Sequence, residues 1–207
     1  MNRLLTFMFV LFGLLAASVP GAARASEVTQ FTGGVLSADF SSLDPSDPSG
    51  CVGNAVSFFA LGGKQGPGNS AAIAWISLAI ARYNTCTGET LVEAHGFHRG
   101  TDLAIHVTKQ LNTASLQGTV DVTDVGSGKT SPVTLDMHWT GVGSTAYIRQ
   151  HTQIKKPGLL LNSNSGMAVR SADATGTVMA PWGQATPAPA YMAELRWINS
   201  ATLTLDK

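Results

Sequence analysis

The chain has 207 residues, of which 44% are hydrophobic and only 13% are charged, and its formal net charge is zero. Proteins that bind nucleic acid neutralise many phosphates with basic residues, and the one basic doublet here, Lys155-Lys156, precedes a Pro-Gly turn. Past the first residues, no segment reaches the ~20 apolar residues that a membrane-spanning helix needs. The composition therefore predicts a globular domain with no nucleic-acid partner and no membrane span.

Residues 1–25 have the layout of a secretory signal peptide. A basic start is followed by an apolar run over residues 4–17, a Pro-Gly pair, and small residues just before position 26. Cleavage there leaves about 180 residues, enough for one domain with a substantial core. We therefore expect a single domain over residues 26–207 in a secreted or periplasmic protein.

The chain contains two cysteines, Cys51 in DPSGCVGN and Cys86 in YNTCTGE, both in turn-like surroundings. In an oxidising compartment such a pair usually forms a disulfide. Closing a loop of this length stabilises a fold by about 3 to 4 kcal/mol in the chain-entropy model. A catalytic thiol would leave the other cysteine unpaired, and a structural zinc site normally uses closely spaced cysteines. The sequence therefore predicts a structural disulfide.

Alternating apolar and polar residues predict strands from Glu27 to Phe40 and from Ala55 to Leu61, separated by a proline-rich loop. The next segment, Ala71 to Tyr83, is ambiguous. Its alanines could form a helix capped by Ser70, but its isoleucines and Trp75 favour a strand with two apolar faces. We interpret it as a buried central strand.

Residues 90–109 read as a hairpin that turns at Arg99-Gly100. In that register the apolar residues share one face and the polar residues share the other, whereas a slip by one residue mixes them. Glu93 and His95 then lie on the same face as His106 in the opposite strand.

A second hairpin follows the same logic, with residues 116–122 opposite residues 133–139 across the turn DVGSGKTSP. Further strands are predicted over residues 146–154 and 167–178, with a closing hairpin around Asn199-Ser200. About ten strands joined mostly by short turns indicate an all-β fold. We expect an antiparallel β-sandwich with one disulfide, the alternative being a closed or flattened β-barrel.

Three stretches, YNTCTGE, LDMHWTGVG and RSADATGTV, occur in an order and spacing that resemble exported, β-rich bacterial proteins of uncharacterised function. The resemblance covers residues 71–178. It implies a strand for Ala71 to Tyr83, and it implies no activity, cofactor or catalytic residue.

Glu93, His95 and His106 are candidate metal ligands, because the predicted hairpin places Glu93 directly opposite His106. Imidazole and carboxylate groups bind divalent transition metals, and an open coordination position lets the metal activate water. The alternative is an ordinary cross-strand contact between solvent-facing side chains. No other cofactor is expected.

Two further features bear on a ligand or a catalytic site. Trp75 and Trp139 fall on faces assigned to the core, whereas Trp182, between Pro181 and Gly183 in a loop, is a candidate ligand contact. The chain lacks the GxSxG nucleophile motif, and GSGKT lacks the preceding glycine of a phosphate-binding loop. No catalytic residue is therefore predicted.

These observations favour a secreted or periplasmic binding or structural module whose loops contact a protein or a carbohydrate. Two alternatives remain open. One is a metal-dependent hydrolase that uses Glu93, His95 and His106, and the other is a barrel that carries a small apolar ligand inside.

Overall fold

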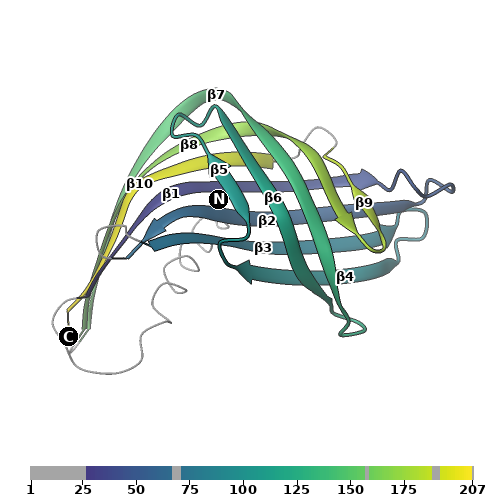
Figure 1. The fold of residues 1–207 in the computed structure, drawn as a ribbon, viewed down its shortest axis with the longest axis horizontal. Helices are drawn as coiled ribbons and strands as arrows, with labels where there is room; N and C mark the ends of the chain where they lie inside the picture. Colours follow the sequence, from purple (N-terminus) through teal and green to yellow (C-terminus); the bar gives the residue numbers. More distant parts are fainter. Residues whose placement is uncertain (1–26, 67–70, 157–158, 188–191, 207) are drawn as a thin grey trace.

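The computed structural model describes residues 27–66, 71–156, 159–187 and 192–206, and every regular element within these ranges is a β-strand (Figure 1). The predicted signal peptide lies outside the described residues. None of the residues described here forms a helix that is long and apolar enough to cross a membrane. The strands are β1 (Glu27–Leu43), β2 (Val52–Gln65), β3 (Ala71–Asn84), β4 (Thr90–Arg99), β5 (Ala104–Val107), β6 (Thr113–Asp124), β7 (Thr130–Lys156), β8 (Leu159–Ala180), β9 (Gly183–Ala185) and β10 (Met192–Asp206).

The ten strands of the described residues belong to one antiparallel sheet. Nine of them follow one another in the order β10-β1-β2-β3-β4-β6-β7-β8-β9. Because β10 also pairs with β8, eight of the strands follow one another in a ring, while β5 is attached to β6. Figure 1 shows the sheet curving over on itself, so that β6 and β7 cross in front of β1, β2 and β3. The predicted all-β antiparallel fold is confirmed, and its two facing walls are parts of one continuous sheet.

The core lies between the two walls of the ring. Trp139 of β7 is the largest fully buried side chain. Its ring lies 5.7 Å from that of Phe58 in β2 in an edge-to-face arrangement, and its indole N–H donates a hydrogen bond to the Ser37 carbonyl at 3.3 Å. Contacts of this kind stabilise a core beyond the area that they bury. The predicted second hairpin and the faces of its residues are confirmed, because β6 pairs with β7 along its whole length, with Leu116 opposite Met137 and Val120 opposite Val133.

The ambiguous alanine-rich segment is strand β3, which pairs with β2 on one side and β4 on the other. Its even-numbered residues from Ala74 to Ile80 are buried in the core, and the odd-numbered residues between them point to the outer face. Trp75 is therefore on the outer face, where it is partly buried against a second hydrophobic cluster and not against the core inside the ring. The buried residues of that cluster are Phe31, Val35, Leu61 and Ile198.

The predicted hairpin between β4 and the following strand does not form. β4 pairs with β3 and β6, whereas β5 pairs with β6 at a different place and faces β1 and β2 across the ring. Gly34 of β1 and Gly62 of β2 make room for β5, because a Cβ atom at Gly34 would lie 2.2 Å from Cβ of Val107. Val107 is buried in the core, so the apolar face of β5 is covered by the opposite wall of the ring and not by β4.

The disulfide joins Cys51 and Cys86, whose Cα atoms are 5.4 Å apart. It connects the β1–β2 turn to the β3–β4 turn at one end of the ring, where the Asp47 carboxylate also accepts hydrogen bonds from the N–H groups of Cys51 and Val52. The predicted pairing is confirmed. Because disulfides persist in oxidising surroundings, it indicates an oxidising compartment.

At the other end, β7 and β8 run on past the ring together with the ends of β10 and β1, forming a ribbon at the lower left of Figure 1. The predicted closing hairpin is wrong, because Asn199 lies at a register shift within the single strand β10. The polar residues 162–166 likewise lie within strand β8. Polar residues on a two-sided ribbon imitate the local pattern of a turn.

Candidate binding site

A hollow of about 420 Å³ lies on the outer face of β1 to β4. We call it the outer hollow. Its floor is formed by small side chains, because the strand register places Ser57 beside Ala79 and Ala55 beside Ala81. The outward-facing residues that line it are Asp39, Ser41, Ala55, Ser57, Ala79, Ala81, Glu93 and His95.

Glu93 and His95 form one side of the outer hollow. They occupy alternate positions of β4, paired with Ala81 and Ala79, respectively, and His95 Nε2 lies 3.3 Å from Glu93 Oε1. Their side chains are 56% and 57% exposed. Because both groups face solvent, the carboxylate can accept hydrogen bonds from a ligand and the imidazole can donate or accept them. Asp39 lines the hollow on the opposite side, in β1.

An aromatic row adjoins the outer hollow and consists of Phe59, Trp75 and Phe97. The ring centroids of Phe59 and Trp75 are 5.3 Å apart, and those of Trp75 and Phe97 are 5.8 Å apart. Phe97 is 53% exposed and lies two residues beyond His95 on the same face of β4. The row thus places an accessible aromatic ring directly beside the polar side of the hollow.

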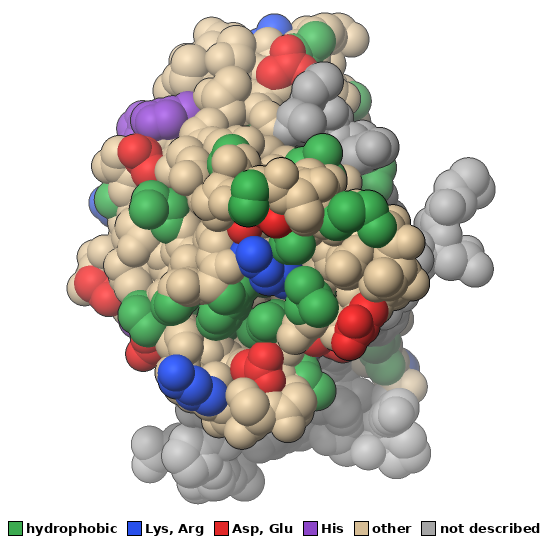
Figure 2. Space-filling model, turned by 90° about the vertical axis from the view of Figure 1, so that its right-hand side faces the viewer, with side chains coloured by type: hydrophobic (Ala, Val, Ile, Leu, Met, Phe, Trp, Pro, Cys, Tyr) green, Lys and Arg blue, Asp and Glu red, His purple; other side chains and the backbone are tan. Residues whose placement is uncertain are grey.

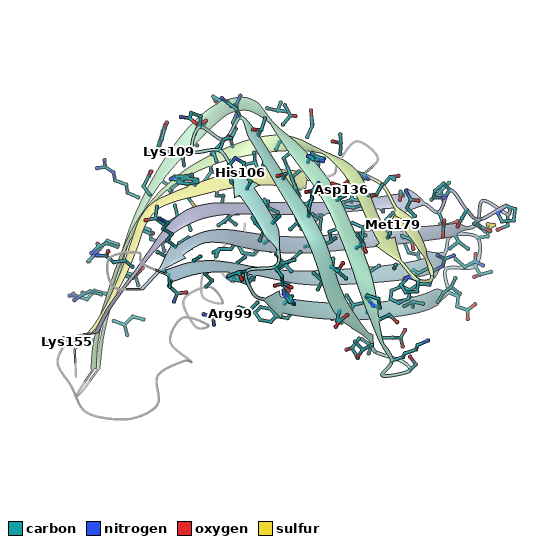
Figure 3. All side chains as sticks on the ribbon, in the orientation of Figure 1. Arg99, His106, Lys109, Asp136, Lys155 and Met179 are labelled. Atoms are coloured by element: carbon teal, nitrogen blue, oxygen red, sulfur yellow. A yellow bond between two sulfur atoms is a disulfide. The ribbon has the colours of Figure 1, made fainter. Side chains whose placement is uncertain are left out.

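The structure does not assemble the predicted metal site. His95 pairs with Thr123 of β6, whereas His106 pairs with Ser115 of the same strand. Eight residues of β6 separate these two positions, which is about 26 Å at ~3.3 Å per residue. Figure 3 likewise shows Arg99, at the end of β4, well apart from His106 in β5.

Glu93 and His95 therefore remain a pair, without His106. Across the described residues, no group of three or more histidine, cysteine, aspartate or glutamate side chains could hold a metal ion. The metal prediction fails because it depended on a hairpin between β4 and β5. A local alternation pattern is equally compatible with other strand neighbours.

The aromatic row was missed because Trp75 was assigned to the core. Both faces of β3 carry apolar residues, so its alternation alone does not say which face is inside. Ser77, two residues after Trp75, is exposed and shares its face. From residue 77 on, Ser77, Ala79 and Ala81 give this face less apolar bulk than Ile76, Leu78 and Ile80 give the other, and this difference is the signal that the sequence offers.

Trp182 lies away from the outer hollow, at the end of the ring that carries the disulfide. It is partly buried and packs against the core. Its carbonyl accepts a hydrogen bond from Arg82, whose Nη1 also lies 2.6 Å from a carboxylate oxygen of Asp44. Gly183 is required here, because a Cβ atom would collide with both partners of this ion pair. Contact between Trp182 and a ligand stays a prediction.

Asp44 is the buried acid of this end, with no exposed side-chain surface. Burial raises its pKa, but hydrogen bonds from Ser46 and the guanidinium of Arg82 outweigh this effect, so the pKa of Asp44 is lowered from its ordinary value.

Figure 2 shows the face of the molecule at this end, where acidic, basic and apolar side chains are interspersed without a large patch of one charge. The described residues of this face therefore form no strongly charged surface.

Comparisons with protein-family models, with curated proteins and with solved structures give no match for this chain. The resemblance of YNTCTGE and the two other stretches to exported bacterial proteins stays a prediction. The support for a function therefore comes from the outer hollow and the aromatic row.

Proposed function

We propose that the protein is an exported binding domain and that it holds a carbohydrate in the outer hollow, against the aromatic row. The Cys51–Cys86 disulfide supports a place of action outside the cytoplasm. The domain acts by binding alone, and no catalytic step is assigned to it.

The chemistry of the hollow suits a sugar. A sugar ring has an apolar face of C–H groups, which stacks on aromatic rings, and a rim of hydroxyl groups, which need hydrogen-bond partners. Phe97 and Trp75 offer the first kind of contact, and Glu93 and His95 offer the second. Hydrogen bonds to an ionised carboxylate are stronger than those between neutral groups. The volume of about 420 Å³ lies within the range of small-molecule sites.

The observation that carries the proposal is the position of His95 and Phe97 on one face of β4, two residues apart. Residues with this spacing stand about 6.6 Å from each other along a strand. One ligand can therefore contact the imidazole and the aromatic ring at once. The small side chains of Ala79 and Ala81 leave the space in which it would lie.

Two other ligands receive less support. A protein partner normally covers about 800 Å² of each surface, whereas the features that converge here surround a small depression. A small apolar ligand inside the ring would have to displace side chains, because the described interior is filled by a core that includes Trp139, Phe58 and Met137.

The proposal is tested by binding of the purified protein to cellulose, chitin, starch and mannan, in sedimentation assays and by calorimetry with soluble fragments. We expect binding to at least one of them. Ala79→Leu, which fills the hollow, and Phe97→Ala, which removes the exposed ring, should each weaken it at least 10-fold. Thr119→Leu, at an exposed position of β6, is the control for Ala79→Leu.

The same binding assays can also contradict the proposal. Absence of binding to every polysaccharide would contradict it, and so would a protein ligand recovered in their place. Equal weakening by Ala79→Leu and Thr119→Leu would place the sugar elsewhere on the molecule.

A further inference from the structure

The charged side chains that line the outer hollow are mostly acidic. Asp39 contributes a carboxylate from β1, and Glu93 contributes one from β4. Among the described residues that line the hollow, no lysine or arginine accompanies them, and the basic group is the imidazole of His95. The hollow therefore attracts a positively charged group of a ligand and repels an anion.

A third carboxylate lies beside the aromatic row. Gly96 of β4 pairs with Val122 of β6, so the next residues of the two strands, Phe97 and Asp121, are neighbours. A Cβ atom at Gly96 would lie 2.6 Å from the Asp121 carbonyl oxygen, which shows that the strands remain in contact there. Val122 is buried in the core, so Asp121 points outward, and its side chain is exposed like that of Phe97. A cation above the Phe97 ring is attracted both by the ring and by this carboxylate.

Two arginines on the same face of the sheet do not cancel these charges. Arg196 of β10 is paired with Glu194. Arg99 lies four residues from His95 on the outer face of β4, which is about 13 Å at ~3.3 Å per residue. Arg99 therefore lies beyond the aromatic row, and the hollow keeps its negative charge.

We propose that the ligand of this site is a sugar chain with free amino groups, an oligomer or polymer of 2-amino-2-deoxy sugars. The inference rests on the proposed function, because the same aromatic row stacks the sugar rings. An ammonium group donates hydrogen bonds to Asp39 or Glu93 as a hydroxyl group does, and it adds the attraction between opposite charges. A neutral chain keeps the stacking contact and loses this attraction, so it binds more weakly.

The spacing of the carboxylates favours a chain over a single sugar. Asp39 and Glu93 lie on β1 and β4, three strand spacings apart, which is about 14 Å at ~4.8 Å per spacing. Consecutive sugars of a chain can place amino groups beside both carboxylates at once, whereas a single sugar reaches one of them. Glucosamine alone should therefore bind more weakly than its oligomers.

The test compares chito-oligosaccharides of equal length in the N-acetylated and the deacetylated form, by calorimetry in slightly acidic buffer, where the free amines are protonated. We expect the deacetylated tetramer to bind at least about 10-fold more tightly, which corresponds to roughly 1.4 kcal/mol. Asp39→Asn and Glu93→Gln should each reduce this preference and leave the affinity for the N-acetylated tetramer nearly unchanged.

Asp136→Asn is the matched control for Glu93→Gln. Asp136 lies 3.3 Å from the imidazole of His138, as Glu93 does from that of His95, and both carboxylate side chains are 56% exposed. Asp136 does not line the outer hollow. The control variant should therefore keep the full preference for the deacetylated tetramer.

Several outcomes would overturn the inference. Equal binding of the two tetramers, or tighter binding of the N-acetylated one, would refute the preference for amines and leave the sugar-binding function intact. A lysine tetrapeptide that binds as tightly as the deacetylated tetramer would show that charge alone is recognised. Equal loss of the preference in Asp136→Asn and Glu93→Gln would place the effect outside the hollow. A protein that binds none of the oligosaccharides would contradict the proposed function as well.

Discussion

The two halves of β7 show how one strand behaves in two surroundings. From Val133 to Trp139, every second side chain is fully buried, and Met137 and Trp139 are among the largest. After a shift in register between Val142 and Ala146 the strand continues to pair with β8, yet Tyr147 and Ile148 are exposed. The comparison teaches that alternation decides which face a residue occupies. Burial requires an opposite wall, which β1 and β2 provide only for the first half.

The largest expected difference between the two halves is in stability. Trp139→Ala removes a fully buried ring and should lower the free energy of unfolding by about 3 to 5 kcal/mol. Tyr147→Ala should change it by no more than about 0.5 kcal/mol, as is usual for an exposed residue. Urea denaturation followed by circular dichroism measures both, and similar losses would mean that the ribbon is packed against a wall after all.

The disulfide belongs to the end of the ring farthest from the ribbon. Replacing both Cys51 and Cys86 with alanine should cost about 3 to 4 kcal/mol, because the unfolded chain is no longer restricted by a closed loop. The free energy of unfolding of the double variant is to be compared with that of the reduced native protein. If the free energy of unfolding falls by less than about 1 kcal/mol in both the double variant and the reduced protein, the sheet itself stabilises this end without the disulfide.

Two glycines extend the comparison to the backbone. A Cβ atom at Gly34 meets Val107 of β5, whereas nothing lies within 4 Å of a Cβ atom at Gly166, near the ribbon. Gly34→Ala should therefore cost about 1 to 3 kcal/mol through overpacking, and Gly166→Ala should be nearly neutral. Adding Val107→Ala should recover part of the loss at Gly34, and thermal unfolding of the four proteins checks this. Without such recovery, β5 does not lie against β1.

The smallest effect is expected at low pH. The pKa of Asp44 is lowered from its ordinary value, so this group stabilises the fold above about pH 4, its unfolded range. That contribution is lost as the pH falls through the lower, folded pKa. Urea midpoints measured from pH 7 to pH 3 should fall less steeply for Asp44→Asn than for the native protein. An unchanged slope would contradict the role of Asp44, and Asp136→Asn serves as the surface control.

Local patterns made much of the fold predictable. The disulfide followed from a single possible cysteine pair, and the β6–β7 hairpin with its apolar face followed from a strict alternation on both sides of a short turn. The pairing of β4 with β6 was not predictable. The alternation of apolar and polar residues in β4 is compatible with any neighbouring strand that has one apolar face. The place of β5 was not predictable either, because the contact of Val107 with Gly34 joins residues far apart in the chain.

The candidate site was predictable in part for the same reason. Glu93 and His95 share a face, as expected, because residues two apart in a strand always do. Their neighbours come from other strands, and only the three-dimensional pairing brings Ala79 beside His95. Phe97 lies two residues from His95, but its place beside Trp75 depends on that same pairing.

The most direct test of the account is a nuclear magnetic resonance titration of the isotope-labelled protein with soluble gluco-, chito- and manno-oligosaccharides. The account predicts that the amide signals of Ala79, His95 and Phe97 shift with the added sugar, while those of Thr119 and Tyr147 stay in place. Shifts confined to the ribbon or to the end with the disulfide, or none at all, would contradict it.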